Sequence, residues 1–138
     1  MSANATLISN VRNPPTRLQN ADGTAFKSMS IAPPAAGTRV KTIQITSDDT
    51  SPRVLQFAVT IGGVDYVLGE VSIPAGSGTD DASNSVNGLN STKMPGLQTD
   101  GINRWIDIAN GSDLKVKAKT AVTAAKSIYL FTECGDFT

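Results

Sequence analysis

Residues 54–73 read VLQFAVTIGGVDYVLGEVSI, two β-rich runs on either side of a glycine pair. Four apolar residues of the first run occupy alternate positions: Leu55, Phe57, Val59 and Ile61. Side chains alternate between the two faces of a strand, so these four share one face, which we expect to be buried. Gly62 and Gly63 tolerate the positive φ angles of a tight turn. The stretch therefore predicts a β-hairpin of two strands, Arg53–Ile61 and Val64–Ile73.

Strand-like patterns recur along the rest of the chain. The further strands that they predict are residues 5–9, 26–31, 39–47, 104–109, 113–119 and 126–133. A helix competes only over residues 114–125, where a period of two rather than 3.6 favours a strand. Fifteen threonines and many Gly, Asn and Ser residues favour strands and turns over helices. We therefore expect an all-β fold, an antiparallel β-sandwich or jelly roll.

Two parts of the chain do not fit a regular sandwich. Because Asn13-Pro14-Pro15 forbids regular strand pairing, residues 1–20 are predicted as an extended N-terminal arm and residues 21–138 as a single β-sandwich domain. Residues 74–101 are rich in turn formers and unusually long for a structureless loop. This loop is expected either to contact a partner or to cross over with a short helix or an extra strand. Gly69, inside an expected strand, indicates a bulge or a close backbone approach.

Composition argues against several classes of function. Twelve basic and twelve acidic residues give a net charge of zero, which argues against the broad basic surface of a nucleic-acid-binding protein. With no histidine and one cysteine, Cys134, a histidine-based triad, a typical zinc site and an internal disulfide are excluded. No apolar run is long enough to cross a membrane, and residues 1–15 lack a signal-peptide pattern. We expect no enzyme activity, cofactor, metal or catalytic residue, and synthesis in a cytoplasm.

Two short patterns in the long loop suggest ligand sites at first sight. Asp80 and Asp81 suggest calcium, because hard cations bind several carboxylate and carbonyl oxygens. Nothing else fixes the remaining ligands, so a solvated acidic loop is the better interpretation. Residues 76–79 resemble a phosphate cradle, but no lysine follows them and no helix is indicated. Neither pattern is predicted as a site.

A basic stripe and a set of aromatic residues each allow two interpretations. Lys115, Lys117 and Lys119 share one strand face, which either meets an acidic neighbour or is an outward face that resists aggregation. Four aromatic residues either form a carbohydrate-stacking platform or pack in the core and interfaces: Tyr66, Trp105, Tyr129 and Phe131. The acidic residues show no convergence, so a glycosidase-like carboxylate pair is not predicted. Whether Cys134 lies at a subunit interface stays open.

Several segments together have an order that is similar to a known group of proteins. They are ADGTAFKS (21–28), TRVKTI (38–43), QFAVTIGGVDYVLGEVSIPAGSG (56–78), LNSTKMPGLQTDG (89–101) and LKVKAKTAVTAAKSIYLF (114–131). This order resembles small structural proteins encoded in the morphogenesis regions of tailed bacteriophages, most of all head decoration (cement) proteins. The resemblance covers most of the chain after residue 20, and no residue in it is diagnostic of a chemistry.

The resemblance implies a mechanical function. Cement proteins of this kind have β-sandwich or jelly-roll subunits that form homotrimers on the capsid exterior of the virion and stabilise contacts between copies of the major capsid protein. The chain would then be made in the cytoplasm of the host bacterium. Residues 1–15 and 74–101 would be the contact elements. Two alternatives stay open: a tail, neck or baseplate component of the same virion, and a host-surface carbohydrate-binding module.

Overall fold

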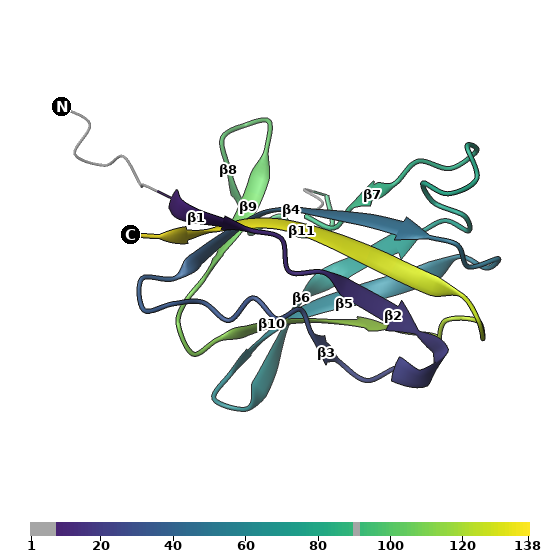
Figure 1. Cartoon of the computed structure of the whole chain (residues 1–138), viewed down its shortest axis with the longest axis horizontal. Coiled ribbons are helices and arrows are strands. Elements are labelled where there is room, and N and C mark those ends of the chain that lie inside the picture. Colours follow the sequence, from purple (N-terminus) through teal and green to yellow (C-terminus); the bar gives the residue numbers. More distant parts are fainter. Residues whose placement is uncertain (1–7, 90–91) are drawn as a thin grey trace.

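The computed structural model describes residues 8–89 and 92–138, and these contain strands and no α-helix (Figure 1). The strands of six residues or more are β4 (Thr38–Ser47), β5 (Arg53–Ile61), β6 (Val64–Ile73), β10 (Asp113–Ala118) and β11 (Ser127–Phe137). The shorter strands are β1 (Ile8–Arg12), β2 (Thr16–Gln19), β3 (Lys27–Ser28), β7 (Val86–Asn87), β8 (Gln98–Thr99) and β9 (Arg104–Ile108). One 3-10 turn spans Asn20–Asp22. The expected all-β fold is confirmed.

The strands form two packed antiparallel sheets. The seven-stranded sheet has the order β1-β11-β4-β9-β8, with β2 also paired to β11 and β7 to β4. The four-stranded sheet has the order β3-β10-β5-β6. Figure 1 shows them as two layers, with β4 and β11 in one and β5 and β10 in the other. This confirms an antiparallel β-sandwich, while the jelly-roll connectivity stays a prediction.

The space between the sheets is filled mainly by aliphatic side chains. Inward positions of the long strands supply Val40, Ile43, Ile45, Leu55, Phe57, Val71, Leu114, Val116, Ile128 and Leu130. The expected buried face of β5 is confirmed at Leu55, Phe57 and Val59. Ile61 was expected on this face too, but it is exposed, because the hairpin runs past the part of the sheet that the other layer covers.

The β5–β6 hairpin has the strand limits that the sequence predicts. Its two-residue turn has φ angles of 59° at Gly62 and 81° at Gly63, the positive values that a tight hairpin turn requires. Further along the hairpin, the pairing register shifts between Phe57 and Ala58, opposite Gly69 and Val67. The bulge predicted at Gly69 is therefore present.

Gly69 also lies against a neighbouring backbone segment. A Cβ atom at this position would be 2.7 Å from the carbonyl oxygen of Lys93 and 3.0 Å from Cγ of Met94. Only glycine allows the long loop to pack this closely on β6, so both features expected at Gly69 occur together.

Gly69→Ala is expected to lower the free energy of unfolding by about 1–3 kcal/mol, the usual cost of forcing extra volume into a packed site. Gly96→Ala is the matched control, because a Cβ there has no heavy atom within 4 Å. Urea denaturation of both variants measures the difference. Equal stability of the two variants would show that the loop moves away from β6 without cost.

The N-terminal segment is paired within the chain from Ile8 onward. β1 and β2 both pair with β11, and the residues between them, Asn13-Pro14-Pro15, form no strand, as predicted. Residues 1–7 of the expected arm, including most of the expected strand over residues 5–9, lie outside the described residues. The division at residue 20 between an arm and a single domain stays a prediction.

The long loop contributes extra strands and core residues. β7 pairs with β4 and β8 with β9, so of the alternatives left open for this segment an extra strand is present, while contact with a partner stays a prediction. Its scattered apolar residues Leu89, Met94 and Leu97 are buried in the core. They anchor a segment whose sequence otherwise consists mainly of turn formers.

Several strands differ from the expectation. The first strand continues beyond residue 9 to Arg12, and β2 was not predicted. The strand expected over residues 26–31 is only Lys27–Ser28, because Ser30 and Ala32 have positive φ angles that end regular pairing. The last strand continues from Glu133 to Phe137, because β1 and β4 supply pairing partners on both of its sides.

Candidate interaction surface

The outer face of the seven-stranded sheet carries exposed apolar side chains. In β11, Ile128 and Leu130 point into the core, so the alternate residues Tyr129 and Phe131 point outward. Phe131 is 53% exposed. Val11 of β1, which pairs with Gly135, is 68% exposed. We call Val11, Tyr129 and Phe131 the outer apolar face.

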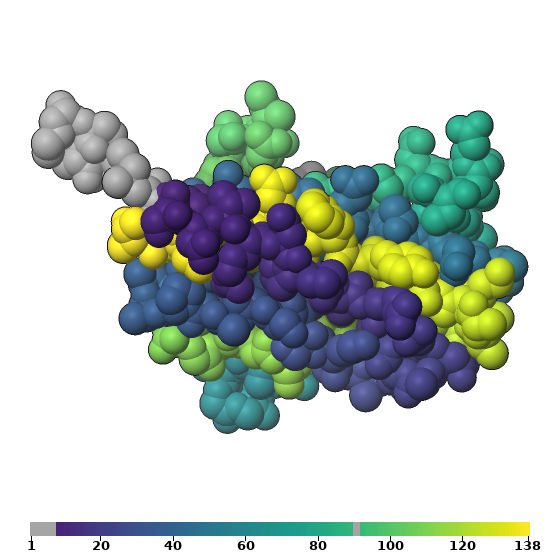
Figure 2. Space-filling model, in the orientation of Figure 1, coloured from purple at the N-terminus to yellow at the C-terminus, as the bar shows by residue number. Residues whose placement is uncertain are grey.

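Two segments of the long loop and its continuation rise above this sheet. Figures 1 and 2 show the β8–β9 hairpin as one projection and the chain leading into β7 as another, with β4 and β11 between them. A groove of about 660 Å³ lies beside the hairpin, and its lining includes Arg39, Lys41, Leu89, Ile102, Trp105 and Glu133. Because both charge signs line the groove, it has no clear preference for an anionic or a cationic ligand.

The β8–β9 hairpin is held in shape by hydrogen bonds. At its turn, the Asp100 carboxylate accepts the backbone N–H groups of Ile102 and Asn103. These hydrogen bonds, with that of Asn103 contributing most, lower the pKa of Asp100. At its base, Arg104 donates to the carbonyl oxygens of Pro95 and Leu97. Ile102 at the tip is 91% exposed, so this fixed hairpin presents an apolar side chain to solvent.

Arg39 connects the hairpin to the sheet. Its guanidinium forms an ion pair with Asp107, with 2.8 Å between Nε and Oδ1. The same group lies over the rings of Trp105 and Phe137, 4.9 and 5.3 Å from their centroids. A stacked, paired arginine fixes Trp105 in place.

The structure brings three of the four candidate aromatic residues to one sheet. Trp105, Tyr129 and Phe131 belong to strands of the seven-stranded sheet, whereas Tyr66 lies on β6 in the other layer. The side chain of Trp105 donates a hydrogen bond to Gln98, 2.8 Å from Nε1 to Oε1. A single stacking platform made of all four residues is not formed within one subunit.

The lysine stripe is engaged within the subunit. Lys115 lies 3.9 Å from Asp65, Lys119 lies 2.8 Å from Glu70, and Lys117 lies over the ring of Phe26. β3 pairs with β10 only at Lys115 and Val116, so β5 is the only described strand paired at Lys117, and the interpretation of the stripe as protection of a sheet edge stays open.

In the long loop, the side chains of the suggested calcium and phosphate patterns make hydrogen bonds to nearby backbone groups. The carboxylate of Asp80 accepts the N–H groups of Ala82 and Ser83, which lower its pKa. Thr79 donates to the carbonyl oxygens of Ser47 and Gly76. Among the described residues no group of three or more His, Cys, Asp and Glu side chains is placed to hold a metal. The same part of the chain has no helix long and apolar enough to span a membrane.

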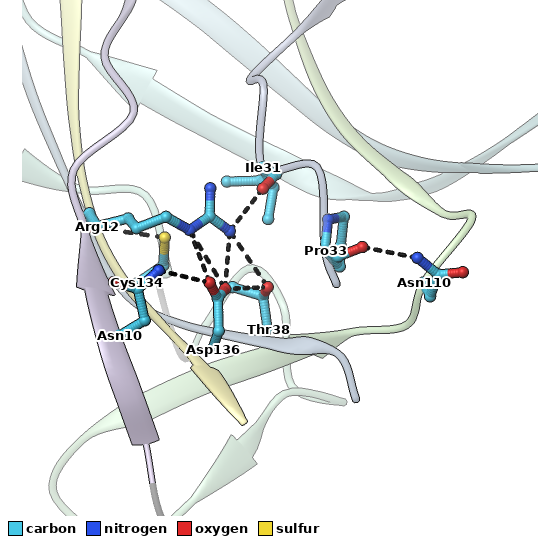
Figure 3. A network of polar contacts seen from close by, with 8 residues as sticks. All are labelled: Asn10, Arg12, Ile31, Pro33, Thr38, Asn110, Cys134 and Asp136. Carbon is cyan, nitrogen blue, oxygen red and sulfur yellow. Dashed lines mark hydrogen bonds and ion pairs between the residues drawn. The ribbon is translucent and has the colours of Figure 1, made fainter. Parts of the chain in front are cut away.

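A polar network that the sequence did not reveal joins the two ends of the chain (Figure 3). Asp136 is hydrogen-bonded by Arg12, Thr38 and Asn10, with 2.8 Å between Arg12 Nη2 and Asp136 Oδ1. Arg12 also donates to the carbonyl oxygen of Ile31. These contacts fix β1 to β4 and β11 beside the outer apolar face.

Cys134 lies within the same region of the subunit and belongs to the hydrophobic core. Its thiol donates to the carbonyl oxygen of Arg12, 3.5 Å away. Burial raises the pKa of the thiol, which keeps it in its unreactive protonated form.

Comparison with known proteins identifies no family. No protein-family model and no curated protein matches the chain. Among solved structures, a pentameric capsid protein isolated from metagenomic phage sequences is 15% identical, with a TM-score of 0.41, over 90% of this chain and 59% of that one. A second structure with this description, solved by iodide SAD phasing, is 15% identical with a TM-score of 0.39, over 90% of this chain and 61% of that one. The chain thus spans about three-fifths of those proteins.

Proposed function

We propose that this chain is a bacteriophage head decoration protein that binds the outside of the capsid and stabilises contacts between major capsid subunits. The observation that carries the proposal is the outer apolar face. Tyr129 and Phe131 lie exposed on β11, whose other side forms the core, and Val11 lies exposed on β1, which pairs with β11. Exposed aromatic and aliphatic side chains grouped on one face are typical of a protein contact surface.

Electrostatics supports a protein partner over nucleic acid. The chain has no net charge, and its lysine stripe on β10 is engaged by Asp65, Glu70 and Phe26. A binding mode based on phosphate neutralisation needs a surplus of basic groups. An apolar contact between rigid sheets needs none, which fits a structural protein without enzyme activity.

The proposed assembly is a homotrimer on the capsid exterior. Several weak contacts made by one oligomer add up to tight attachment, so each outer apolar face need not bind strongly alone. The N-terminal segment over residues 1–15 and the loop over residues 74–101 would extend this contact. Light scattering of the purified protein is expected to give three times the mass of one chain. A different multiple would show that the proposed trimer is wrong.

Electron microscopy of antibody-labelled particles tests the location. Label over the whole head is the expected result. Label confined to the neck, tail or baseplate would overturn the decoration function and favour the alternative structural component. A carbohydrate-binding module would instead bind glycans and lose this binding in Trp105→Ala or Tyr66→Ala.

Phe131→Ala is expected to weaken binding to heads that lack the protein by at least about tenfold, because it removes an aromatic side chain from the centre of the proposed contact. Phe26→Ala is the matched control: this ring lies on the four-stranded sheet, beneath Lys117. Co-sedimentation with such heads measures both affinities. Equal binding by the two variants would show that the capsid contact does not lie on the outer apolar face.

A further inference from the structure

β6 presents an open edge of unusual length. It has ten residues and ends the four-stranded sheet, and β5 is its only strand partner among the described residues. The other strands at the ends of the two sheets are much shorter: β3 and β8 have two residues each, and β1 has five. A long open edge is a template for another strand, and proteins normally protect it with lysine, proline or a covering segment.

The half of β6 next to the turn has no lysine, no proline and no covering segment among the described residues, and Asp65 is its one charged side chain. Val64, Asp65, Tyr66 and Val67 are all exposed, and Tyr66 is 55% exposed. The covering loop reaches β6 only further along, where Lys93 and Met94 lie against Gly69. Figures 1 and 2 show the turn of the β5–β6 hairpin projecting from the body of the subunit.

The hairpin geometry determines which backbone groups face the open edge. Ile61 and Val64 flank the two-residue turn and form its closing hydrogen-bonded pair. In an antiparallel ladder hydrogen-bonded pairs alternate, so Tyr66 also directs its backbone groups toward β5. Asp65 and Val67 therefore direct their N–H and C=O groups outward, where no described strand accepts them.

We propose that β6 pairs antiparallel with β6 of a second copy, about a twofold axis through Tyr66. In this register Asp65 lies opposite Val67 of the second copy, and each such pair exchanges two backbone hydrogen bonds. Tyr66 lies opposite Tyr66 of the second copy. The two four-stranded sheets become one continuous sheet, and the exposed Val64 and Tyr66 side chains, which share a face, meet their own copies.

Charge and geometry together select this register and a second copy as the occupant. An axis through Asp65 would place two like charges directly opposite each other, which is destabilising. An axis through Val67 would extend the pairing across the bulge between Val67 and Gly69, where the regular alternation of backbone groups is interrupted. The outward N–H and C=O groups of Asp65 and Val67 lie symmetrically about Tyr66, so an identical strand turned about this residue pairs with all of them and brings no like charges together. Lys115, 3.9 Å from Asp65, moderates the one charge in the half of β6 next to the turn.

The contact does not depend on the proposed function. It lies on the four-stranded sheet, away from the outer apolar face, so it joins two single subunits or two trimers equally well. If Phe131→Ala leaves binding to heads unchanged while β6 pairing is found, only the proposed function fails.

Substitutions at Val67 test the register through the sign of the charge. Val67→Asp places a carboxylate opposite Asp65 of the second copy and is expected to weaken association at least tenfold. Val67→Lys places an ammonium there and is expected to leave association equal or tighter. Sedimentation velocity over a range of concentrations measures both. Equal weakening by both variants, or no self-association of the unmodified chain up to about 1 mM, would overturn the proposal.

A symmetric cross-link tests the position of the axis. Residues opposite each other in a non-hydrogen-bonded pair have Cβ atoms close enough for a disulfide, so Tyr66→Cys is expected to give a covalent dimer under mild oxidation. Ile102→Cys, more exposed but on the other sheet, is the control and is expected to stay uncross-linked. Cys134 is buried and does not compete. Equal cross-linking of both variants would mean random collision and would contradict the pairing.

Discussion

Asp49→Ala is expected to lower the free energy of unfolding by about 3–5 kcal/mol, because removing one member of a buried ion pair leaves the other charge without compensation. The carboxylate of Asp49 is fully buried and lies 2.8 Å from Nε of Arg53. It also accepts the backbone N–H groups of Ser51 and Thr123 and the hydroxyl of Thr123. One side chain thus holds the turn before β5 against the turn before β11.

The pKa of Asp49 shows which effect dominates at this site. Burial alone would raise the pKa, because it penalises the charged carboxylate. The hydrogen bonds from Thr123, Arg53 and Ser51 outweigh burial and hold the pKa well below its ordinary value. The charged form is therefore the one that the fold stabilises.

Asp107→Ala is the control for this prediction, since Asp107 also pairs with an arginine at 2.8 Å but at the surface. Surface pairs contribute about 0–1 kcal/mol. Chemical denaturation at neutral pH compares the two variants. A similar loss of unfolding free energy in both variants would mean that the buried Asp49 pair stabilises the protein no more than a surface ion pair does.

The parts of the fold that could be predicted are those determined by local sequence. The β5–β6 hairpin follows from alternation on both sides of Gly62-Gly63, and its strand limits agree with the structure. The bulge at Gly69 follows because a glycine in a strand nearly always has a backbone reason. In these cases the residues that interact are neighbours in the chain.

The parts that could not be predicted depend on contacts between distant residues. Arg12 and Asp136 are separated by 124 positions, and Asp49 and Thr123 by 74. Nothing in a one-dimensional pattern selects these partners from the other charged and hydroxyl residues. The exposure of Ile61 is another example, because the alternation shows which face it occupies but not where the opposite sheet ends.

The candidate surface shows the same division. Alternation in the last strand places Tyr129 and Phe131 on one side, but the sequence alone left open whether that side is core or solvent. Val11 joins this face only through the pairing of β1 with the end of β11, where it lies opposite Gly135 and further along the strand than Phe131. Surfaces made from both ends of a chain are seen only once the sheet order is known.

Acid is expected to lower the free energy of unfolding of this protein through the protonation of two carboxylates, Asp136 and Asp49. Hydrogen bonds from Arg12 contribute most to lowering the pKa of Asp136 from 3.8 to about 2, with further hydrogen bonds from Thr38 and Asn10 acting against burial. A folded-state pKa below the unfolded value means that the unfolded chain binds protons more readily. The resulting stability is complete above about pH 4 and is lost as the pH falls through about 2.

The contribution of Asp136 corresponds to about 2 kcal/mol, since one pKa unit is worth about 1.4 kcal/mol. Asp136→Asn is expected to remove this amount at pH 7. Most of the difference is expected to be gone at pH 2, where about half of the Asp136 carboxylates are protonated in the folded protein and nearly all in the unfolded chain. Urea denaturation at a series of pH values measures the difference. A gap between the two proteins that stays constant from pH 7 to pH 2 would show that Asp136 stabilises by shape rather than by charge. A gap that closes would show that the charged form of Asp136, which pairs with Arg12, adds stability to the contact between β1 and β11.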